Sequence, residues 1–236
     1  MVRAATVIIF LTGVFFVGKL WINLKALQNP AATIDEAAPS PTVAMPTVNP
    51  AAENILKITS RDHVRGSRFA EIALIEYGDL ECPYCKSFQP TLQQMITVYQ
   101  SRVMWVYRHF PLIMHANAQK EAEASECAYD QGGDEAFWTF INNIFDKTGS
   151  NGTGFSLDQL YPLAVGIGLN GQKFQQCLDS GKYKKYVMEQ ESAGLKAGVS
   201  GTPGSFVVNL TTGQSQAIAG AVTFEQLKSV IDGMLK

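Results

Sequence analysis

Net charge is nearly absent from this chain. Its 236 residues carry 19 Lys and Arg against 21 Asp and Glu, which leaves a formal net charge of −2. Such a balance provides no field that would gather nucleic acid or an anionic lipid surface. Charged residues make up only 17% of the sequence and hydrophobic residues 46%. The chain is therefore not a solvated disordered one, and it can bury a full core.

Cysteine and histidine are also scarce, with four and three residues. Neither His109 nor His115 has a second ligand at the spacing of a metal motif, so the sequence predicts no metal site and no cofactor. His109 is interpreted as structural and His115 as a helix-start residue. Internal repeats are absent too. What remains to carry chemistry is the set of cysteines: Cys82, Cys85, Cys127 and Cys177.

The N-terminal 27 residues contain a long apolar run. Between Ala4 and Leu24 the only charged residue is Lys19, whose long side chain can extend to a membrane interface. About 20 apolar residues suffice to cross a bilayer core. A cleaved signal peptide is the alternative, but Pro30-Ala31-Ala32 is only a weak cleavage site. We therefore expect a signal anchor over residues 1–27, and both interpretations place the rest of the chain outside the cytoplasm.

Residues 28–52 have the composition of a spacer. They hold five of the ten prolines among Ala, Thr, Ser and Val, and show neither helical nor strand periodicity. This predicts a semi-extended linker. The folded domain is then residues 53–236.

The order of apolar segments in that domain predicts an α/β fold. The expected elements are strands over 55–59, 71–77 and 103–110, a helix from Pro83 to Tyr99, a helical block over about 115–199, a hairpin of strands 205–209 and 216–219, and a final helix opening at the Thr223-x-x-Gln226 capping box. A helical crossover makes the strands on either side of it parallel. Without the helical block, this is the thioredoxin topology.

The motif Cys82-Pro83-Tyr84-Cys85 lies where a predicted strand ends and a helix begins. Proline suits the first helical position, because its missing N–H would lack a partner there anyway. The free N–H groups and the dipole of a helix N-terminus favour a thiolate on Cys82. We therefore predict that Cys82 is the exposed nucleophile and Cys85 the shielded resolving thiol.

Two other interpretations of the motif stay open at this point. The pair can be half of a zinc site completed by Cys127 and Cys177, although these lie about 40 and 90 residues downstream without knuckle spacing. It can also be a purely structural disulfide. The placement between a strand and a helix favours the redox interpretation.

Several segments together resemble the DsbA-like group of the thioredoxin superfamily, over nearly all of residues 53–236. They are I-E-Y-G-D-L-E-C-P-Y-C-K-S-F from Ile75, R-H-F-P-L from Arg108, the helical insert, and G-T-P-G-S-F from Gly201. A glutaredoxin also carries the four-residue motif but is shorter and lacks the insert. The resemblance implies a thioredoxin fold with an inserted α-helical subdomain and thiol:disulfide oxidoreductase activity.

The resemblance also implies roles for residues outside the motif. Thr202-Pro203 matches the cis-proline pair that lies against the active-site disulfide, where the Thr202 backbone would bond an extended substrate. Glu76 resembles the buried acid beneath the cysteine pair; the alternative is a strand-end glutamate in water. Asp79 and Glu81 are expected to be solvated.

Cys127 and Cys177 both fall in the helical insert. In an oxidising compartment, two cysteines on adjacent helices favour a structural disulfide, and some DsbA-like proteins carry such a bridge. The alternative is two buried thiols packed as small apolar groups.

The function expected from the sequence is donation of the Cys82–Cys85 disulfide to reduced or unfolded exported proteins. A single-pass anchor in the cell membrane would hold the catalytic domain on the extracytoplasmic side, near a membrane reoxidase of the DsbB or VKOR type. A reductase or isomerase using the same residues is one alternative. A non-enzymatic chaperone or scaffold for unfolded exported chains is another.

Overall fold

The computed structural model describes residues 57–149, 153 and 155–236. All of them belong to one compact unit, Met45–Lys236. The expected anchor, 1–27, and linker, 28–52, lie outside the described residues. Within the described part, none of the helices has both the length and the apolar character that crossing a bilayer requires.

A five-stranded sheet in the order β1-β3-β2-β4-β5 forms the centre of the domain. Its strands are β1 (His63–Gly66), β2 (Ile72–Gly78), β3 (Val103–His109), β4 (Gly204–Asn209) and β5 (Ser215–Ala219). β2 and β3 are parallel, as the crossover predicts, and the other pairs are antiparallel. All seven residues of both β2 and β3 are buried, which explains why these two segments read as continuous apolar runs.

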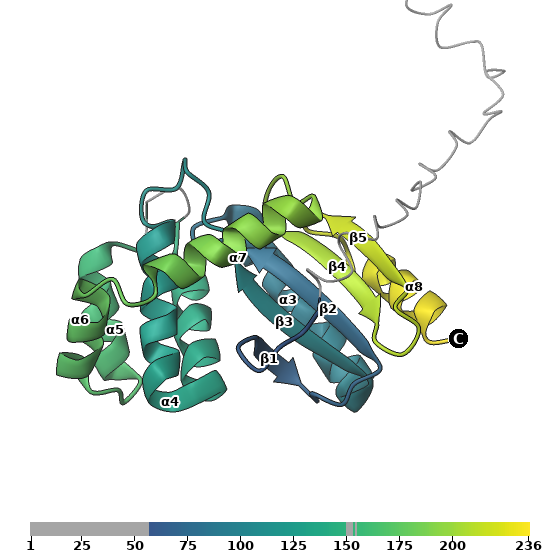
Figure 1. The fold of residues 1–236 in the computed structure, drawn as a ribbon, viewed down its shortest axis with the longest axis horizontal. Coiled ribbons are helices and arrows are strands. Elements are labelled where there is room, and N and C mark those ends of the chain that lie inside the picture. Colours follow the sequence, from purple (N-terminus) through teal and green to yellow (C-terminus); the bar gives the residue numbers. More distant parts are fainter. Residues whose placement is uncertain (1–56, 150–152, 154) are drawn as a thin grey trace, which may run out of the picture. The chain divides into compact units, whose positions relative to one another are not determined.

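Alternate residues of β2 supply two separate cores. Ile72 and Leu74 face α3 (Pro83–Tyr99) and α8 (Phe224–Met234), together with Trp105 of β3. Ala73, Ile75 and Tyr77 face the opposite side, where they pack with Val199 and Phe206. The sheet therefore has covered faces on both sides, which confirms the α/β architecture expected from the sequence (Figure 1).

The helical insert comprises α4 (Ala118–Lys147), η2 (Leu157–Gln159), α5 (Leu160–Gly166), α6 (Gly171–Asp179) and α7 (Lys184–Ala197). Gly133, with φ +63°, interrupts α4 and allows it to kink. In Figure 1, α4, α5 and α6 gather beside the sheet and α7 runs from them back to it. A disulfide between Cys127 and Cys177 joins α4 to α6. Because these sulfurs bond each other, they do not complete a zinc site with the motif.

The N-terminal edge of the sheet differs from the prediction. Residues 57–59 of the strand expected over 55–59 are not in a strand, and the edge strand is β1, His63–Gly66. Only four residues long and paired with β3 alone, β1 lacks the alternating apolar pattern that identifies a strand in sequence. The hairpin of β4 and β5 is as expected, and the Thr223–Gln226 capping box opens α8.

Close packing of α7 on the sheet requires a glycine at position 194. A Cβ there would lie 2.8 Å from ring atoms of both Phe110 and Tyr77. We expect Gly194→Ala to lower the free energy of unfolding by about 1–3 kcal/mol through overpacking, despite a gain of about 1 kcal/mol in helix propensity. Gly233→Ala in α8, where a Cβ meets no atom within 4 Å, is the matched control and should be neutral or stabilising. Urea unfolding of both variants would measure the difference; equal stabilities would contradict the packing argument.

Candidate active site

The Cys82-Pro83-Tyr84-Cys85 motif opens α3 directly after β2. Cys82 is the N-cap residue, with extended backbone angles (φ −75°, ψ 124°), and Pro83 begins the helix. No side chain caps this helix end. The free N–H groups of the first turn are therefore available to a negative charge on the Cys82 sulfur.

Cys82 is less exposed than the sequence predicts. Its exposed fraction is 3%, and that of Cys85 is 0%, so only the order of exposure agrees with the expectation. The loop before β4 covers the sulfur: Cys82 Sγ lies 3.3 Å from the carbonyl oxygen of Thr202, and the Thr202–Pro203 peptide bond is cis. Tyr84, at 66%, is the exposed side chain of the motif.

The electrostatics of the two sulfurs differ strongly. A hydrogen bond from the Cys85 thiol is the main cause that lowers the pKa of Cys82 to about 6, against the opposing effect of burial. The Thr202 side chain and the backbone N–H groups of Cys85 and Tyr84 lower it further. Burial raises the pKa of Cys85 well above its usual value. At neutral pH, Cys82 is thus mainly a thiolate and Cys85 a thiol.

This difference predicts the pH dependence of alkylation. In the reduced protein, one cysteine should react with iodoacetamide along a titration curve with a midpoint near pH 6, about 6 being the pKa of Cys82. Cys85 should stay unreactive across that range because its pKa is raised. Mass spectrometry of the alkylated peptide would identify the site. A midpoint above pH 8 would contradict the assigned thiolate.

Glu76 lies on β2 with an exposed fraction of 0%, so the solvated alternative is wrong. The indole Nε1–H of Trp105 donates to its Oε2 at 2.9 Å. Burial raises the pKa of Glu76 to about 8, and the nearby Cys82 charge adds to the shift. The carboxyl group is therefore protonated at neutral pH. When it is ionised, its charge adds to the effect of burial that raises the pKa of Cys85.

Glu76→Gln should stabilise the protein in a pH-dependent way. Between pH 4.5 and pH 8 the carboxyl is ionised in the unfolded chain but protonated in the folded one, so its contribution to stability falls as pH rises. Removing the carboxyl should raise the free energy of unfolding by about 3 kcal/mol at pH 7 and about 1 kcal/mol at pH 5. Glutamine can still accept the Trp105 bond. Urea unfolding of the reduced proteins at both pH values would measure this, and a pH-independent difference would contradict the shift.

Tyr107 is a site residue that the sequence did not indicate. Its ring is fully buried, and its hydroxyl has no hydrogen-bond partner among the described residues. The ring lies so close to Gly78 that a Cβ there would be 2.6 Å from Tyr107 Cε2. Burial is the main cause that raises the pKa of Tyr107, and negative charge on Cys85 or Glu76 raises it further. In the sequence this residue is indistinguishable from an ordinary strand tyrosine.

Asp79 and Glu81 are buried, which overturns the expectation that they are solvated. Asp79 accepts hydrogen bonds from Leu112 N at 2.7 Å and from His115 Nδ1 at 2.8 Å. Glu81 Oε2 accepts from the backbone N–H groups of Asn117 and Ala118, at the start of α4. These carboxylates satisfy backbone donors of the segment between β3 and α4 and of the start of α4. His115 precedes α4 as an ion-pair partner rather than as a residue of the helix.

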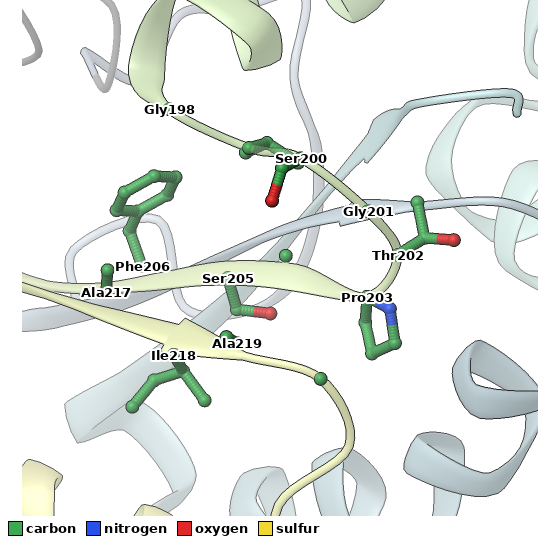
Figure 2. Close-up of a pocket in the computed structure, with 13 residues that line it drawn as sticks. Gly198, Ser200, Gly201, Thr202, Pro203, Ser205, Phe206, Ala217, Ile218 and Ala219 are labelled. Carbon is green, nitrogen blue, oxygen red and sulfur yellow. The ribbon is translucent and has the colours of Figure 1, made fainter. Parts of the chain in front are cut away.

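A cavity of about 260 Å³ adjoins the Thr202–Pro203 bond. It is lined by residues 198–206 and 217–220, from the loop before β4 and from the two hairpin strands. Figure 2 shows Pro203 at the point where this loop enters β4, with Ala217, Ile218 and Ala219 on the neighbouring strand. The cavity thus lies beside the carbonyl group that contacts Cys82 Sγ.

Comparison with known proteins agrees with this geometry. A family model described as thioredoxin matches residues 59–233. The crystal structure of Pseudomonas aeruginosa DsbA2 superimposes with a TM-score of 0.66 and 29% identity, covering 75% of this chain and 97% of that one. Wolbachia pipientis α-DsbA1, at 24% identity and a TM-score of 0.68, covers 78% and 95% and shows the shared fold.

Curated relatives include larger proteins. The Na(+)/H(+) antiporter NhaA 1 of Salinispora arenicola is 35% identical over 148 residues, which is 62% of this chain but 22% of the antiporter. The chain thus spans less than a quarter of the length of that relative.

Proposed function

This chain belongs to the thioredoxin family as a DsbA-like thiol–disulfide oxidoreductase, and on that premise we propose that it acts as a dithiol oxidase for exported proteins. The observation that carries the proposal is the asymmetric cysteine pair. Cys82, at the helix N-terminus, has a lowered pKa, while Cys85 has a raised one. A pair of this kind is stabilised in its reduced form and therefore tends to give its disulfide away.

The reaction begins with the Cys82–Cys85 disulfide. A substrate thiolate attacks Cys82 Sγ, the bond between the two cysteines breaks, and Cys85 leaves as a thiolate. The protonated Glu76 carboxyl, buried near Cys85, is the proton donor that this leaving group needs. A second substrate thiolate then attacks the substrate sulfur of the mixed disulfide and releases Cys82 as a thiolate. The substrate loses two electrons, and the cysteine pair gains them.

The pKa of Cys82 sets the size of the driving force. Lowering it from about 8.5 to about 6 stabilises the reduced pair by roughly 1.4 kcal/mol at pH 7, or about 30 mV. The same shift makes Cys82 a better leaving group in the second step. Both effects favour oxidation of a substrate by the Cys82–Cys85 disulfide.

The cavity at Thr202 and Pro203 provides a place for the substrate. A peptide in extended conformation can bond to backbone groups there, which gives affinity without strong side-chain selectivity. The exposed side chain of Tyr84 at the motif offers apolar contact to the same segment. This combination suits unfolded chains of varied sequence.

An extracytoplasmic location is part of the proposal. The apolar run in residues 1–27 and the proline-rich segment 28–52 support a single-pass anchor with a spacer. The Cys127–Cys177 disulfide supports an oxidising compartment. An anchored enzyme would lie close to a membrane reoxidase of the DsbB or VKOR type. Alkaline extraction of membranes from cells expressing the full chain, compared with a chain beginning at residue 53, tests the anchor.

The decisive test of direction uses the purified oxidised protein and a reduced, unfolded substrate such as ribonuclease A. We expect stoichiometric transfer of the disulfide, followed by mass spectrometry of the alkylated products. Insulin reduction by the reduced protein is the opposing assay. A protein that reduces insulin readily and fails to oxidise ribonuclease is a reductase, and the proposal would be wrong.

The reduction potential against glutathione separates the enzymatic alternatives. A value near about −120 mV is that of a strong oxidant, and one near about −270 mV is that of a thioredoxin-like reductase. Isomerase activity would appear as refolding of scrambled ribonuclease.

A further inference from the structure

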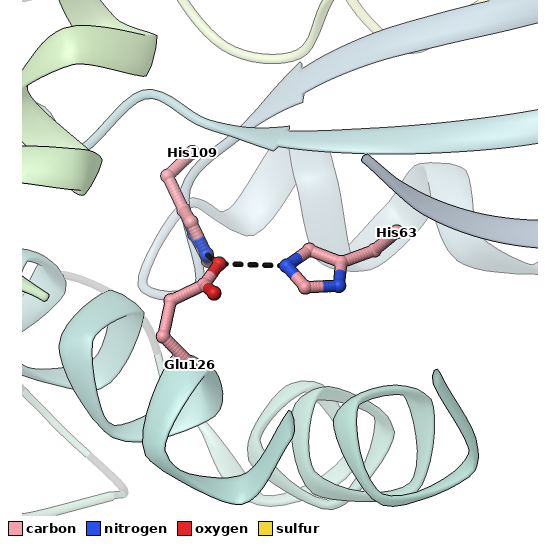
Figure 3. A group of neighbouring side chains, drawn as sticks. All are labelled: His63, His109 and Glu126. Atoms are coloured by element: carbon pink, nitrogen blue, oxygen red, sulfur yellow. Dashed lines mark hydrogen bonds and ion pairs between the residues drawn. The ribbon is translucent and has the colours of Figure 1, made fainter. Parts of the chain in front are cut away.

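Three buried side chains from three separate elements lie close together in the fold, and none of them belongs to the cysteine motif. They are His63 on β1, His109 at the end of β3 and Glu126 on α4, with exposed fractions of 0%, 1% and 2%. The Nε2 atoms of His63 and His109 lie 2.7 Å and 2.9 Å from the same oxygen, Glu126 Oε1. Figure 3 shows both imidazole rings directed at this carboxylate.

Within hydrogen-bond distance, the second nitrogen of each ring has no partner among the described residues. The Nδ1 atoms of both His63 and His109 are buried and have no hydrogen bond there. A histidine that ligates a metal through Nε2 carries its proton on Nδ1, and no described hydrogen bond fixes either ring in the opposite tautomer. The three donor atoms all lie within 4.8 Å of one another.

Asp134 completes the pattern around His63. Its Oδ1 lies 3.6 Å from His63 Nδ1, on the opposite side of the ring from Glu126. A carboxylate next to the second ring nitrogen is a common feature of histidines that ligate metals, because it fixes the tautomer and the ring orientation. The φ of +63° at Gly133 interrupts α4 just before Asp134.

The cluster is closest to solvent on the Asp134 side. The Asp134 side chain is 33% exposed, and its partner Arg68, at 3.2 Å, is 42% exposed. The three donor atoms themselves are buried, so the cluster comes nearest to water at Asp134 and Arg68.

We propose that His63, His109 and Glu126 form a binding site for a divalent transition-metal ion such as Zn²⁺. The ion is held by the two Nε2 atoms and Glu126 Oε1, and the Nδ1–H of His63 is directed at Asp134. Imidazole nitrogen and carboxylate oxygen suit zinc, at ligand distances of about 2.0–2.2 Å. Tetrahedral ligands are then roughly 3.4 Å apart, so each Nε2–Oε1 distance must lengthen by less than about an ångström from its 2.7 Å or 2.9 Å. A water molecule fills the fourth position.

The role of such an ion is structural. It links β1 and β3 of the sheet to α4 of the insert, and an ion that binds only the folded chain stabilises it by mass action. This inference is independent of the redox function, since none of the three ligands belongs to the cysteine motif.

The test uses the full chain, stripped of metal with a chelator, with the Cys82–Cys85 pair oxidised so that free thiolates cannot bind metal. Calorimetric titration with Zn²⁺ should show one ion per chain, and the thermal midpoint should rise on addition of Zn²⁺. Co²⁺ should give visible d–d bands without thiolate charge-transfer absorption.

Variants locate the site. Glu126→Gln should weaken Zn²⁺ binding by about a hundredfold or more, and Asp134→Asn by about 10–100-fold. Asp130→Asn is the matched control, because Asp130 lies one turn away on the same helix, pairs with Lys182 and should leave the affinity unchanged. Circular dichroism would show whether each variant is folded.

The proposal is overturned if the oxidised wild-type chain binds no Zn²⁺ at millimolar concentration, which would leave the cluster as a metal-free hydrogen-bonded network. It is also overturned if Asp134→Asn and Asp130→Asn bind equally well. Should Glu126→Gln fail to fold, the wild-type titration and the Asp134→Asn comparison still decide.

Discussion

Cys82→Ser should abolish thiol–disulfide exchange, with a loss of at least roughly a thousandfold in the rate of ribonuclease oxidation. The reason is that Cys82 supplies the only sulfur of the pair with a lowered pKa. A serine hydroxyl forms no disulfide, and the remaining Cys85 is fully buried. The rate is measured by quenching the reaction with acid and counting the remaining substrate thiols.

Cys85→Ser tests the role of Cys85 as the resolving thiol. It keeps the nucleophilic sulfur but removes the thiol that releases a trapped partner, so mixed disulfides with glutathione should accumulate at Cys82. In Cys85→Ala, which removes the donor altogether, Cys82 should also titrate at a higher pH, since the hydrogen bond from Cys85 is the main cause of the lowered pKa. If Cys82→Ser instead retained full activity in assisting refolding, the chain would be a chaperone or scaffold rather than an oxidase.

Local sequence patterns were sufficient to predict most of the sheet and the helix that carries the motif. The continuous apolar runs of β2 and β3 reflect strands buried on both faces, and Pro83 marks the first residue of α3. β1 was missed because its place at the edge is set by pairing with β3, a long-range contact. The resemblance supplied the cis peptide bond at Pro203, which local spacing does not indicate.

The surroundings of the site were harder to predict for the same reason. Asp79 and Glu81 flank the motif in sequence and were expected in water, yet each is buried against backbone N–H groups more than 30 residues away. The low exposure of Cys82 depends on the Thr202 loop, 120 residues downstream. His63, His109 and Glu126 likewise converge only in the fold, so no linear spacing could indicate the proposed metal site.

Removing the Cys127–Cys177 disulfide should lower the free energy of unfolding by about 4 kcal/mol, the chain-entropy value for a loop of about 50 residues. The bridge closes a loop with a sequence separation of 50 and joins α4 to α6. The double variant Cys127→Ala/Cys177→Ala also loses the packing of Cys127, whose exposed fraction is 1%. Its unfolding midpoint in urea should therefore be no higher than that of the wild type with the bridge reduced.

Reduction of the bridge and its removal by substitution, compared with each other, separate the entropy of loop closure from side-chain packing. With a phosphine reductant in both samples, so that Cys82 and Cys85 are reduced in each, the wild type keeps the Cys127 and Cys177 sulfur atoms and loses only their covalent bond, whereas the double variant loses the sulfurs as well. Equal losses would assign the whole effect to the bond; an excess in the variant measures the packing of Cys127 and Cys177 in the insert. If neither treatment moved the midpoint, the insert would be held together by its apolar contacts alone. A domain that depends on this bond for about 4 kcal/mol is most stable where disulfides persist.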